Sequence, residues 1–183
     1  VDDLTKAGLD SMRTVTYSGG DLDEMAAAKD GSFDDVVTAN DDVALLAFTS
    51  GTTGIPKGVM ISAGAARHYI TMITERLDLH ASDRALETCE LSFDFSVHNM
   101  FSTWEAGASL HILPATTVMN AVKFARNSEL TVWNSVPSLA GMLRQIKALA
   151  PGCLASLRLT VFGGEQLPAS TSTAWQSAAP NSM

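Results

Sequence analysis

The stretch LLAFTSGTTGIPKGVMIS, from Leu45 to Ser62, joins an apolar run to a loop rich in threonine, serine and glycine. Pro56, Lys57 and Gly58 follow in the same loop. Hydroxyl and backbone N–H groups donate hydrogen bonds, glycines let the backbone come close to a ligand, and the lysine adds positive charge. The composition of this loop therefore predicts a site for polyphosphate.

Spacing excludes the two commonest nucleotide-binding motifs at this loop. A P-loop requires glycine directly before its lysine, whereas Pro56 precedes Lys57. The dinucleotide pattern G-x-G-x-x-G is also missing here. A plain turn without function is the remaining alternative, because loops of this composition often follow strands.

The loop also fits a longer family pattern. Residues Phe48 to Gly58 match Y/F-T-S-G-S/T-T-G-x-P-K-G at every position, so the chain resembles the adenylate-forming superfamily. That superfamily includes adenylation domains of nonribosomal peptide synthetases, acyl- and aryl-CoA ligases and luciferases. The resemblance implies that the loop holds the phosphates of ATP through Thr49, Ser50, Gly51, Thr52, Thr53, Gly54 and Lys57.

Composition is that of an ordinary globular protein with an uneven charge. The 183 residues are 46% hydrophobic and 17% charged, and the net charge is −8. Residues 1–42 hold eleven acidic and three basic residues, so the acidic excess lies there. This distribution argues against a nucleic-acid partner. No apolar run approaches the roughly 18 residues of a membrane span. No basic region followed by an apolar run opens the given sequence, so we expect no secretory signal in it.

Cysteine and histidine spacing predicts neither a disulfide framework nor a metal site. Cys89 and Cys153 are isolated, and no two of the four histidines have a metal-ligand spacing. We therefore expect a cytoplasmic protein without a metal site of its own.

Alternating apolar runs and amphipathic stretches predict an α/β fold with an open, mostly parallel sheet and helices on both faces. Residues 1–42 form an acidic, partly irregular segment with a possible strand at 14–17 and a short helix at 22–29, whereas residues 43–183 form the α/β subdomain. We expect strands at 43–48, 85–89, 109–113, 130–133 and 157–162, and helices at 65–77, 97–105, 117–127, 137–148 and 168–177.

Three segments follow strands of this predicted sheet, where ligands bind in such folds. They are the phosphate loop, the turn Ser92–Ser96 and the segment Gly163–Gln166. The strand at 43–48 reads as continuously apolar, which predicts burial on both faces. We therefore expect one shared site at the carboxyl ends of the strands.

The segment LSFDFS places Asp94 between two phenylalanines before a predicted helix. An aspartate at this position often caps the helix. It can also pair with a substrate ammonium, because a carboxylate in an apolar wall is costly without a cation. The chain is similar here to peptide-synthetase adenylation domains, which carry F-D-x-S, and the resemblance implies that Asp94 binds the α-amino group of an amino acid.

The likeness continues over residues 43–180. The segments GASLHIL, LTVWNSVPSL and FGGEQLP resemble those of D-alanine:D-alanyl-carrier-protein ligases in order and spacing. This resemblance places Asp94, Phe95, His98, Ser138, Val161 and Gly163 in the amino-acid pocket, and Gly164, Glu165 and Gln166 against adenine. Gly163 stands where those ligases have cysteine, which leaves more room. His98 replaces an apolar residue, and a surface histidine is its alternative.

The resemblance implies activation of an amino-acid carboxylate by ATP and transfer of the acyl group to a carrier-protein phosphopantetheine thiol. The chain would be a fragment of the large N-terminal lobe of such an enzyme, inactive alone, with the glutamate that binds Mg²⁺ beyond its C-terminus. An acyl- or aryl-CoA ligase and a non-enzymatic binding module are the alternatives.

The sequence also predicts which large apolar and acidic side chains are buried. We expect Trp104, Trp133, Leu139, Met142 and Leu143 in the core. Glu87, Glu90 and Glu105 are expected to be solvated.

Overall fold

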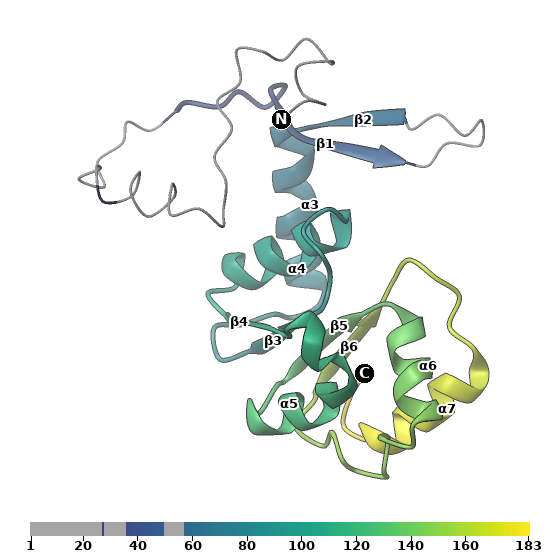
Figure 1. Ribbon diagram of the computed structural model, residues 1–183. Coiled ribbons are helices and arrows are strands. Elements are labelled where there is room, and N and C mark those ends of the chain that lie inside the picture. The colour runs from purple at the N-terminus through teal and green to yellow at the C-terminus, as the bar shows by residue number, and fades with distance from the viewer. Residues whose placement is uncertain (1–26, 28–35, 50–56) are drawn as a thin grey trace. The chain divides into compact units, whose positions relative to one another are not determined.

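The computed structural model of the chain describes residue 27 and residues 36–49 and 57–183 (Figure 1). Its contacts divide the chain into two units, Val1–Val37 and Thr38–Met183. Nearly all described residues belong to the second unit, which carries every strand and helix labelled in Figure 1. The possible strand at 14–17 and most of the helix at 22–29 lie outside the described residues.

A four-stranded parallel sheet forms the centre of the second unit. Its strand order is β4-β3-β5-β6, and every neighbouring pair is parallel. The strands are β3 (Arg84–Glu87), β4 (Ser109–Ile112), β5 (Val132–Ser135) and β6 (Leu159–Phe162). The elements between and after them are α4 (Asp94–Glu105), η1 (Ala115–Asn120), α5 (Ala121–Asn127), α6 (Pro137–Gln145) and α7 (Ala169–Ala178). The predicted open α/β sheet is confirmed.

Helices cover both faces of this sheet. The chain steps from β3 to β4 in one direction and then to β5 and β6 in the other, and right-handed crossovers then place α4 opposite α5 and α6. Successive side chains of each strand point to opposite faces of the sheet. Leu86 and Trp133 belong to the core under α5, α6 and α7, whereas Ala85, Val132 and Leu159 form a smaller cluster on the other face.

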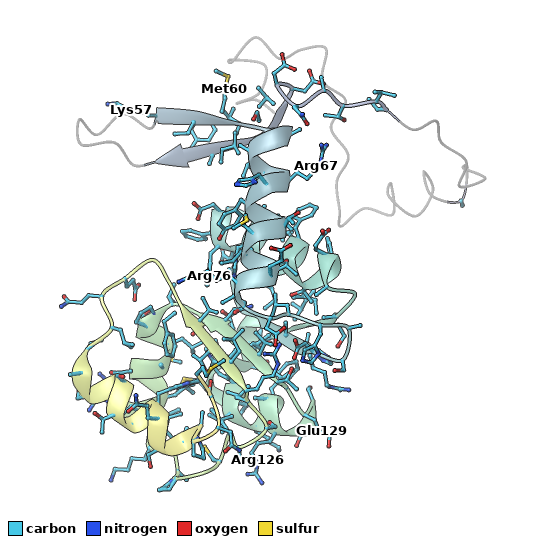
Figure 2. The ribbon with its side chains drawn as sticks, turned by 180° about the vertical axis from the view of Figure 1, so that it is seen from behind. Lys57, Met60, Arg67, Arg76, Arg126 and Glu129 are labelled. Atoms are coloured by element: carbon cyan, nitrogen blue, oxygen red, sulfur yellow. The ribbon has the colours of Figure 1, made fainter. Side chains whose placement is uncertain are left out.

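Two further strands form a separate antiparallel pair. β1 (Val43–Thr49) pairs with β2 (Lys57–Ser62), and Thr49 lies opposite Lys57. The expectation that residues 43–48 form a buried strand of the parallel sheet is wrong, because Phe48 is 66% exposed. Figure 2 shows Met60, also exposed, on the face of β2 turned away from the helix that follows this strand. An apolar run indicates a strand but does not identify its partner.

Helix α3 (Ala63–Arg76) begins directly after β2. The Ser62 hydroxyl accepts a hydrogen bond from the Ala65 N–H at 3.2 Å and caps the helix. The Gly64 N–H donates to the Asn40 carbonyl at 2.8 Å, and a Cβ at this glycine would lie only 3.0 Å from that oxygen. Glycine thus lets residues 38–42 lie against the start of α3.

Burial confirms part of the predicted core. Trp133, Leu139 and Leu143 are buried. Trp104 is 54% exposed and contacts Phe101 edge-to-face, so its predicted core position is wrong. Glu87 is only 3% exposed, and its predicted solvation is wrong because it lies on a central strand under α4. Among the residues that the structure describes, no helix has the length and apolar character to cross a bilayer.

Candidate functional site

A hollow opens where the sheet reverses its strand order. Strands β3 and β5 are neighbours, and Ala85 pairs with Val132. The strand that follows β3 in the chain, β4, lies on one side of this pair, and the strand that follows β5, β6, lies on the other. Open α/β sheets bind ligands at such a point, beyond the carboxyl ends of the strands. The hollow measures about 690 Å³ and is mostly apolar. Its lining comprises Thr88, Cys89, Glu90, Phe93, Asp94, Phe95, Val118, Val136, Leu139, Gly163, Gly164 and Glu165.

Asp94 lies at the first turn of α4, on the wall of this hollow. Phe93 is the N-cap residue and no side chain caps the helix, so the carboxylate of Asp94 does not serve as the cap. A carboxylate in the first turn is still favoured by the helix dipole. Asp94 is exposed, and the structure gives it no hydrogen-bonded cation among the described residues. It is therefore available to a cationic ligand.

Phe95 and Gly163 meet across the hollow. A Cβ added to Gly163 would lie 3.5 Å from the Phe95 ring, which is ordinary van der Waals contact. The missing side chain at Gly163 therefore gives the space against Phe95. Two of the three segments expected at one site, Ser92–Ser96 and the start of Gly163–Gln166, thus come together.

His98 lies behind Phe95 and is not a surface residue. Its imidazole is 6% exposed, stacks on the Phe95 ring at 5.3 Å, and lies 3.0 Å through Nδ1 from the Tyr69 hydroxyl. Burial lowers the pKa of His98 and so favours the neutral ring. His98 lines a second hollow of about 390 Å³, which shares Asp94 and Phe95 with the first.

Val161 and Ser138, which were also predicted in the amino-acid pocket, do not line the first hollow. Val161 packs against the cluster of Ala85, Val132 and Leu159, on the α4 face of the sheet. Ser138 lies in the first turn of α6, beside the hollow but outside its lining.

The Glu165 carboxylate accepts hydrogen bonds at the N-terminus of α6. The Ser138 N–H donates to Glu165 Oε2 at 3.0 Å, and the Ser138 hydroxyl donates to Oε1 at 3.3 Å. The carboxylate thereby satisfies a donor of a helix whose N-cap residue, Val136, supplies no side-chain bond. Gly164 has φ +84°, a conformation that favours glycine, and presents Glu165 to α6. Gln166 is exposed and does not line the hollow.

The predicted phosphate loop is only partly described. Ser50, Gly51, Thr52, Thr53 and Gly54 lie outside the described residues. Thr49 and Lys57 are opposite each other at the end of the β1–β2 pair. The loop therefore connects two antiparallel strands and does not follow a strand of the parallel sheet, contrary to the sequence-based expectation.

Glu87 and Asn99 were not predicted as part of the site. The Glu87 carboxyl accepts hydrogen bonds from the Cys89 N–H at 2.5 Å and from Asn99 Nδ2 at 3.2 Å. Burial raises the pKa of Glu87, and these hydrogen bonds offset only part of that rise. The signal available in the sequence was the alternation of Ala85 and Glu87, which share one face of the strand.

The described residues do not supply a metal site. No group of three or more histidine, cysteine, aspartate or glutamate side chains lies together in the part of the chain that the structure describes. These residues alone do not fit Mg²⁺.

Comparisons with known proteins agree with the fold. The family model described as AMP-binding enzyme matches residues 3–183. The L-proline--[L-prolyl-carrier protein] ligase of Streptomyces coelicolor is 37% identical over 130 residues, which are 69% of this chain and 24% of that protein. Pyochelin synthetase PchF of Pseudomonas aeruginosa is 36% identical over 79% of this chain and 8% of its own length.

Solved structures are similar over more of the chain. The Vibrio cholerae adenylation domain AlmE, in complex with glycyl-adenosine-5'-phosphate, has a TM-score of 0.75 and 29% identity over 98% of this chain and 33% of its own. VinN in complex with L-aspartate has the same TM-score and identity over 89% of this chain and 41% of its own. The chain thus spans less than half of each relative. It belongs to the family of AMP-binding enzymes.

Proposed function

We propose that the protein carrying this chain activates an amino acid with ATP. The substrate carboxylate attacks the α-phosphate, which gives an aminoacyl-AMP and releases pyrophosphate, and a carrier-protein phosphopantetheine thiol then takes the acyl group. The observation that supports this most is the placement of Asp94, an available carboxylate on the wall of an apolar hollow at the switch point of the sheet. The amino-acid–carrier ligase and synthetases among its relatives support the same reaction class.

Within this proposal the chain's residues divide by chemistry. Asp94 binds the α-ammonium group, and Phe95, His98, Ser138, Val161 and Gly163 surround the substrate side chain. Residues Thr49–Gly54 with Lys57 hold the phosphates, and Gly164, Glu165 and Gln166 lie against adenine. Donors placed in advance around the phosphates stabilise the negative charge that moves onto the leaving pyrophosphate. Mg²⁺ would assist there through ligands that the described residues do not supply.

A cytoplasmic location is part of the proposal. Cys89 and Cys153 are both free thiols, which suits a reducing compartment.

Pyrophosphate exchange tests the proposed function. The complete protein that carries this chain is incubated with ATP, labelled pyrophosphate and a panel of amino acids, beside carboxylic acids that lack an amine. We expect label to enter ATP with at least one amino acid. Exchange only with acids that lack an amine would instead identify an acyl- or aryl-CoA ligase, and ATP binding without any exchange would leave a binding module.

Gly163→Cys is expected to shift substrate preference toward smaller side chains. The added Cβ fits at 3.5 Å from Phe95, so the fold tolerates it, but the thiol reduces the space between this ring and β6. One or two methylene volumes change selectivity by about 10- to 200-fold. The ratio of kcat/KM for a large and a small amino acid measures the shift, and Gly163→Ala serves as the intermediate. An unchanged ratio in both variants would remove Gly163 from the substrate pocket.

A further inference from the structure

A buried polar layer lies beneath the hollow, between α4 and the sheet. Glu87 ends β3, and Asn134 lies two residues beyond Val132 on β5, on the same sheet face as Glu87 because Ala85 and Val132 are in register. Asn99 reaches the layer from α4 and donates to Glu87. All three side chains are at least 97% buried. The layer therefore joins two strands of the floor to the helix that carries Asp94 and Phe95.

The layer has more hydrogen-bond acceptors than donors. Glu87 Oε2, Asn99 Oδ1 and Asn134 Oδ1 are all buried without a partner among the described residues. One proton on Glu87 turns one of these acceptors into a donor and so reduces the excess of acceptors in the layer. An ionised Glu87 would leave three unpaired oxygens and an uncompensated charge, which is costly in a buried site.

We propose that Glu87, as a neutral carboxylic acid, is a positioning residue for the substrate-binding wall of this enzyme. Its Oε1 atom accepts hydrogen bonds from the Cys89 N–H, at the start of the loop that lines the hollow, and from Asn99, about one and a half turns along α4 from Asp94. One carboxyl group thus fixes both ends of the segment that carries Phe93, Asp94 and Phe95. This inference rests on the proposed function, because it assigns Glu87 to the placement of Asp94.

The surroundings of Glu87 favour the neutral form. Asn99 on α4 and Asn134 on β5 carry no charge, and no cation is hydrogen-bonded to Glu87 in the described ranges. The titratable group that interacts with Glu87 among the described residues is the Cys89 thiol. Burial raises the pKa of the Cys89 thiol and so keeps it protonated. The direction of the Glu87 pKa, raised by burial, agrees with the hydrogen-bond count.

Two substitutions separate positioning from simple packing. Glu87→Gln keeps an acceptor for Cys89 and Asn99 and replaces the carboxyl proton with an amide N–H, so we expect kcat/KM for the amino acid within about twofold of wild type. Glu87→Leu keeps the volume but removes the acceptor. We expect it to raise KM for the amino acid about tenfold or more while KM for ATP changes little, since misplaced binding groups cost rate even when they are remote from the chemistry. Glu105→Gln and Glu105→Leu, at an exposed site at the end of α4, the helix that Asn99 links to Glu87, are the matched controls.

The comparison is made by pyrophosphate exchange on the complete protein, after circular dichroism confirms that each variant folds. Equal losses in Glu87→Gln and Glu87→Leu, or no loss in folded Glu87→Leu, would overturn the inference. If Glu87→Leu does not fold, the pH profile decides: burial raises the pKa of Glu87, so the activity of Glu87→Gln relative to wild type should rise as the pH increases and the wild-type carboxyl ionises. A flat or falling ratio overturns the inference.

Failure of the proposed function would be visible separately. Wild-type protein that exchanges pyrophosphate only with an acid lacking an amine would refute amino-acid activation. The Glu87 variants would then be compared with that acid, and the same contrast between glutamine and leucine would still decide whether Glu87 positions the wall.

Discussion

Asp94→Ala should abolish most amino-acid activation. We expect kcat/KM for the amino acid to fall between about 30-fold and about 1,000-fold, which corresponds to about 2 to 4 kcal/mol for truncating one member of a charge pair that bound substrate covers. The carboxylate stands on the wall of the 690 Å³ hollow, next to Phe95, and has no competing cation there among the described residues. Pyrophosphate exchange on the complete protein measures the loss.

The substrate provides the control for this prediction. A carboxylic acid with the same side chain but no amine has no charge for Asp94 to pair with, so Asp94→Ala should change its exchange rate by less than about threefold. Asp94→Asn keeps the shape and removes the charge, and should resemble Asp94→Ala with the amino acid. If both substrates lose activity equally, Asp94 acts on the fold of α4 and does not bind the ammonium group.

The sequence predicted the site best where chemistry and local order coincide. Asp94 and Gly163 are 69 positions apart, yet both were expected at the carboxyl ends of parallel strands, and the structure brings their segments together in one hollow. That expectation followed from the strand–helix alternation alone, because parallel strands place the loops that follow them at one edge of a sheet.

Pairing partners could not be read from the same patterns. The run at 43–48 has the composition of a buried parallel strand but pairs antiparallel with β2, whose residues KGVMIS were not predicted as a strand. Period and composition describe one strand, whereas pairing depends on a second segment and on which surfaces remain free. For this reason the phosphate loop was wrongly expected to follow a strand of the parallel sheet, whereas it connects two antiparallel strands.

Charge was an equally poor guide to burial. Glu87 and Asp83 are charged residue types that lie almost wholly inside the protein, and each is held by groups from other elements. Glu165 was expected only against adenine, yet its carboxylate caps α6 through Ser138. Such roles depend on partners many positions away, which one sequence does not reveal.

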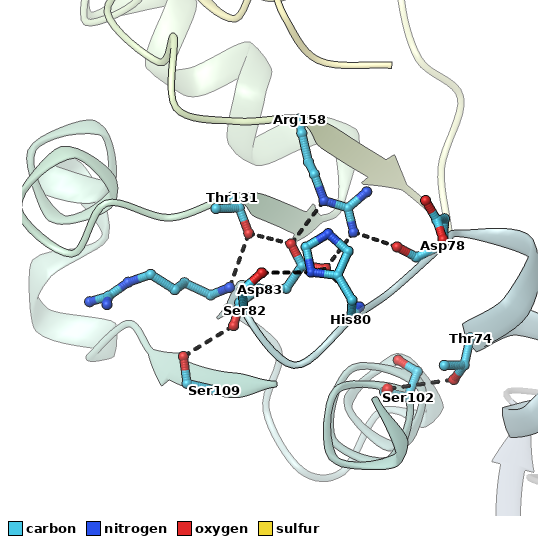
Figure 3. A network of polar contacts seen from close by, with 10 residues as sticks. Thr74, Asp78, His80, Ser82, Asp83, Ser102, Ser109, Thr131 and Arg158 are labelled. Atoms are coloured by element: carbon cyan, nitrogen blue, oxygen red, sulfur yellow. Dashed lines mark hydrogen bonds and ion pairs between the residues drawn. The ribbon is translucent and has the colours of Figure 1, made fainter. Parts of the chain in front are cut away.

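Asp83→Ala should be the most destabilising substitution at the edge of the sheet opposite the hollow. Figure 3 shows the Asp83 carboxylate between groups that precede three different strands. Arg158 donates to it through Nε at 2.9 Å and through Nη2, Thr131 donates at 2.7 Å, and the His80 N–H donates at 3.0 Å. The Asp83 side chain is fully buried, so its loss leaves Arg158 without its partner. We expect a loss of about 3 to 5 kcal/mol in the free energy of unfolding.

The contribution of Asp83 should also depend on pH in a defined direction. Burial alone raises the pKa of Asp83, but hydrogen bonds from Arg158, Thr131 and His80 and the charge of Arg158 outweigh it, so the net pKa is lowered. A carboxyl group with a lowered folded-state pKa stabilises the protein fully above its unfolded pKa of about 3.9 and loses that effect as the pH falls through the folded value. The difference between wild type and Asp83→Asn should therefore be constant near neutral pH and shrink below about pH 4.

Urea unfolding of the complete protein at several pH values measures both effects. Glu75→Ala, on an exposed position of α3, is the matched control and should change the free energy of unfolding by less than about 0.5 kcal/mol. Arg158→Lys should lie between wild type and Asp83→Ala, because a lysine cannot donate to Asp83 from two nitrogens while also reaching the Asp78 carbonyl. If the difference in the free energy of unfolding between wild type and Asp83→Asn grows as the pH falls, Asp83 is not stabilised as an anion. Another interaction would then have to hold the starts of the three strands together.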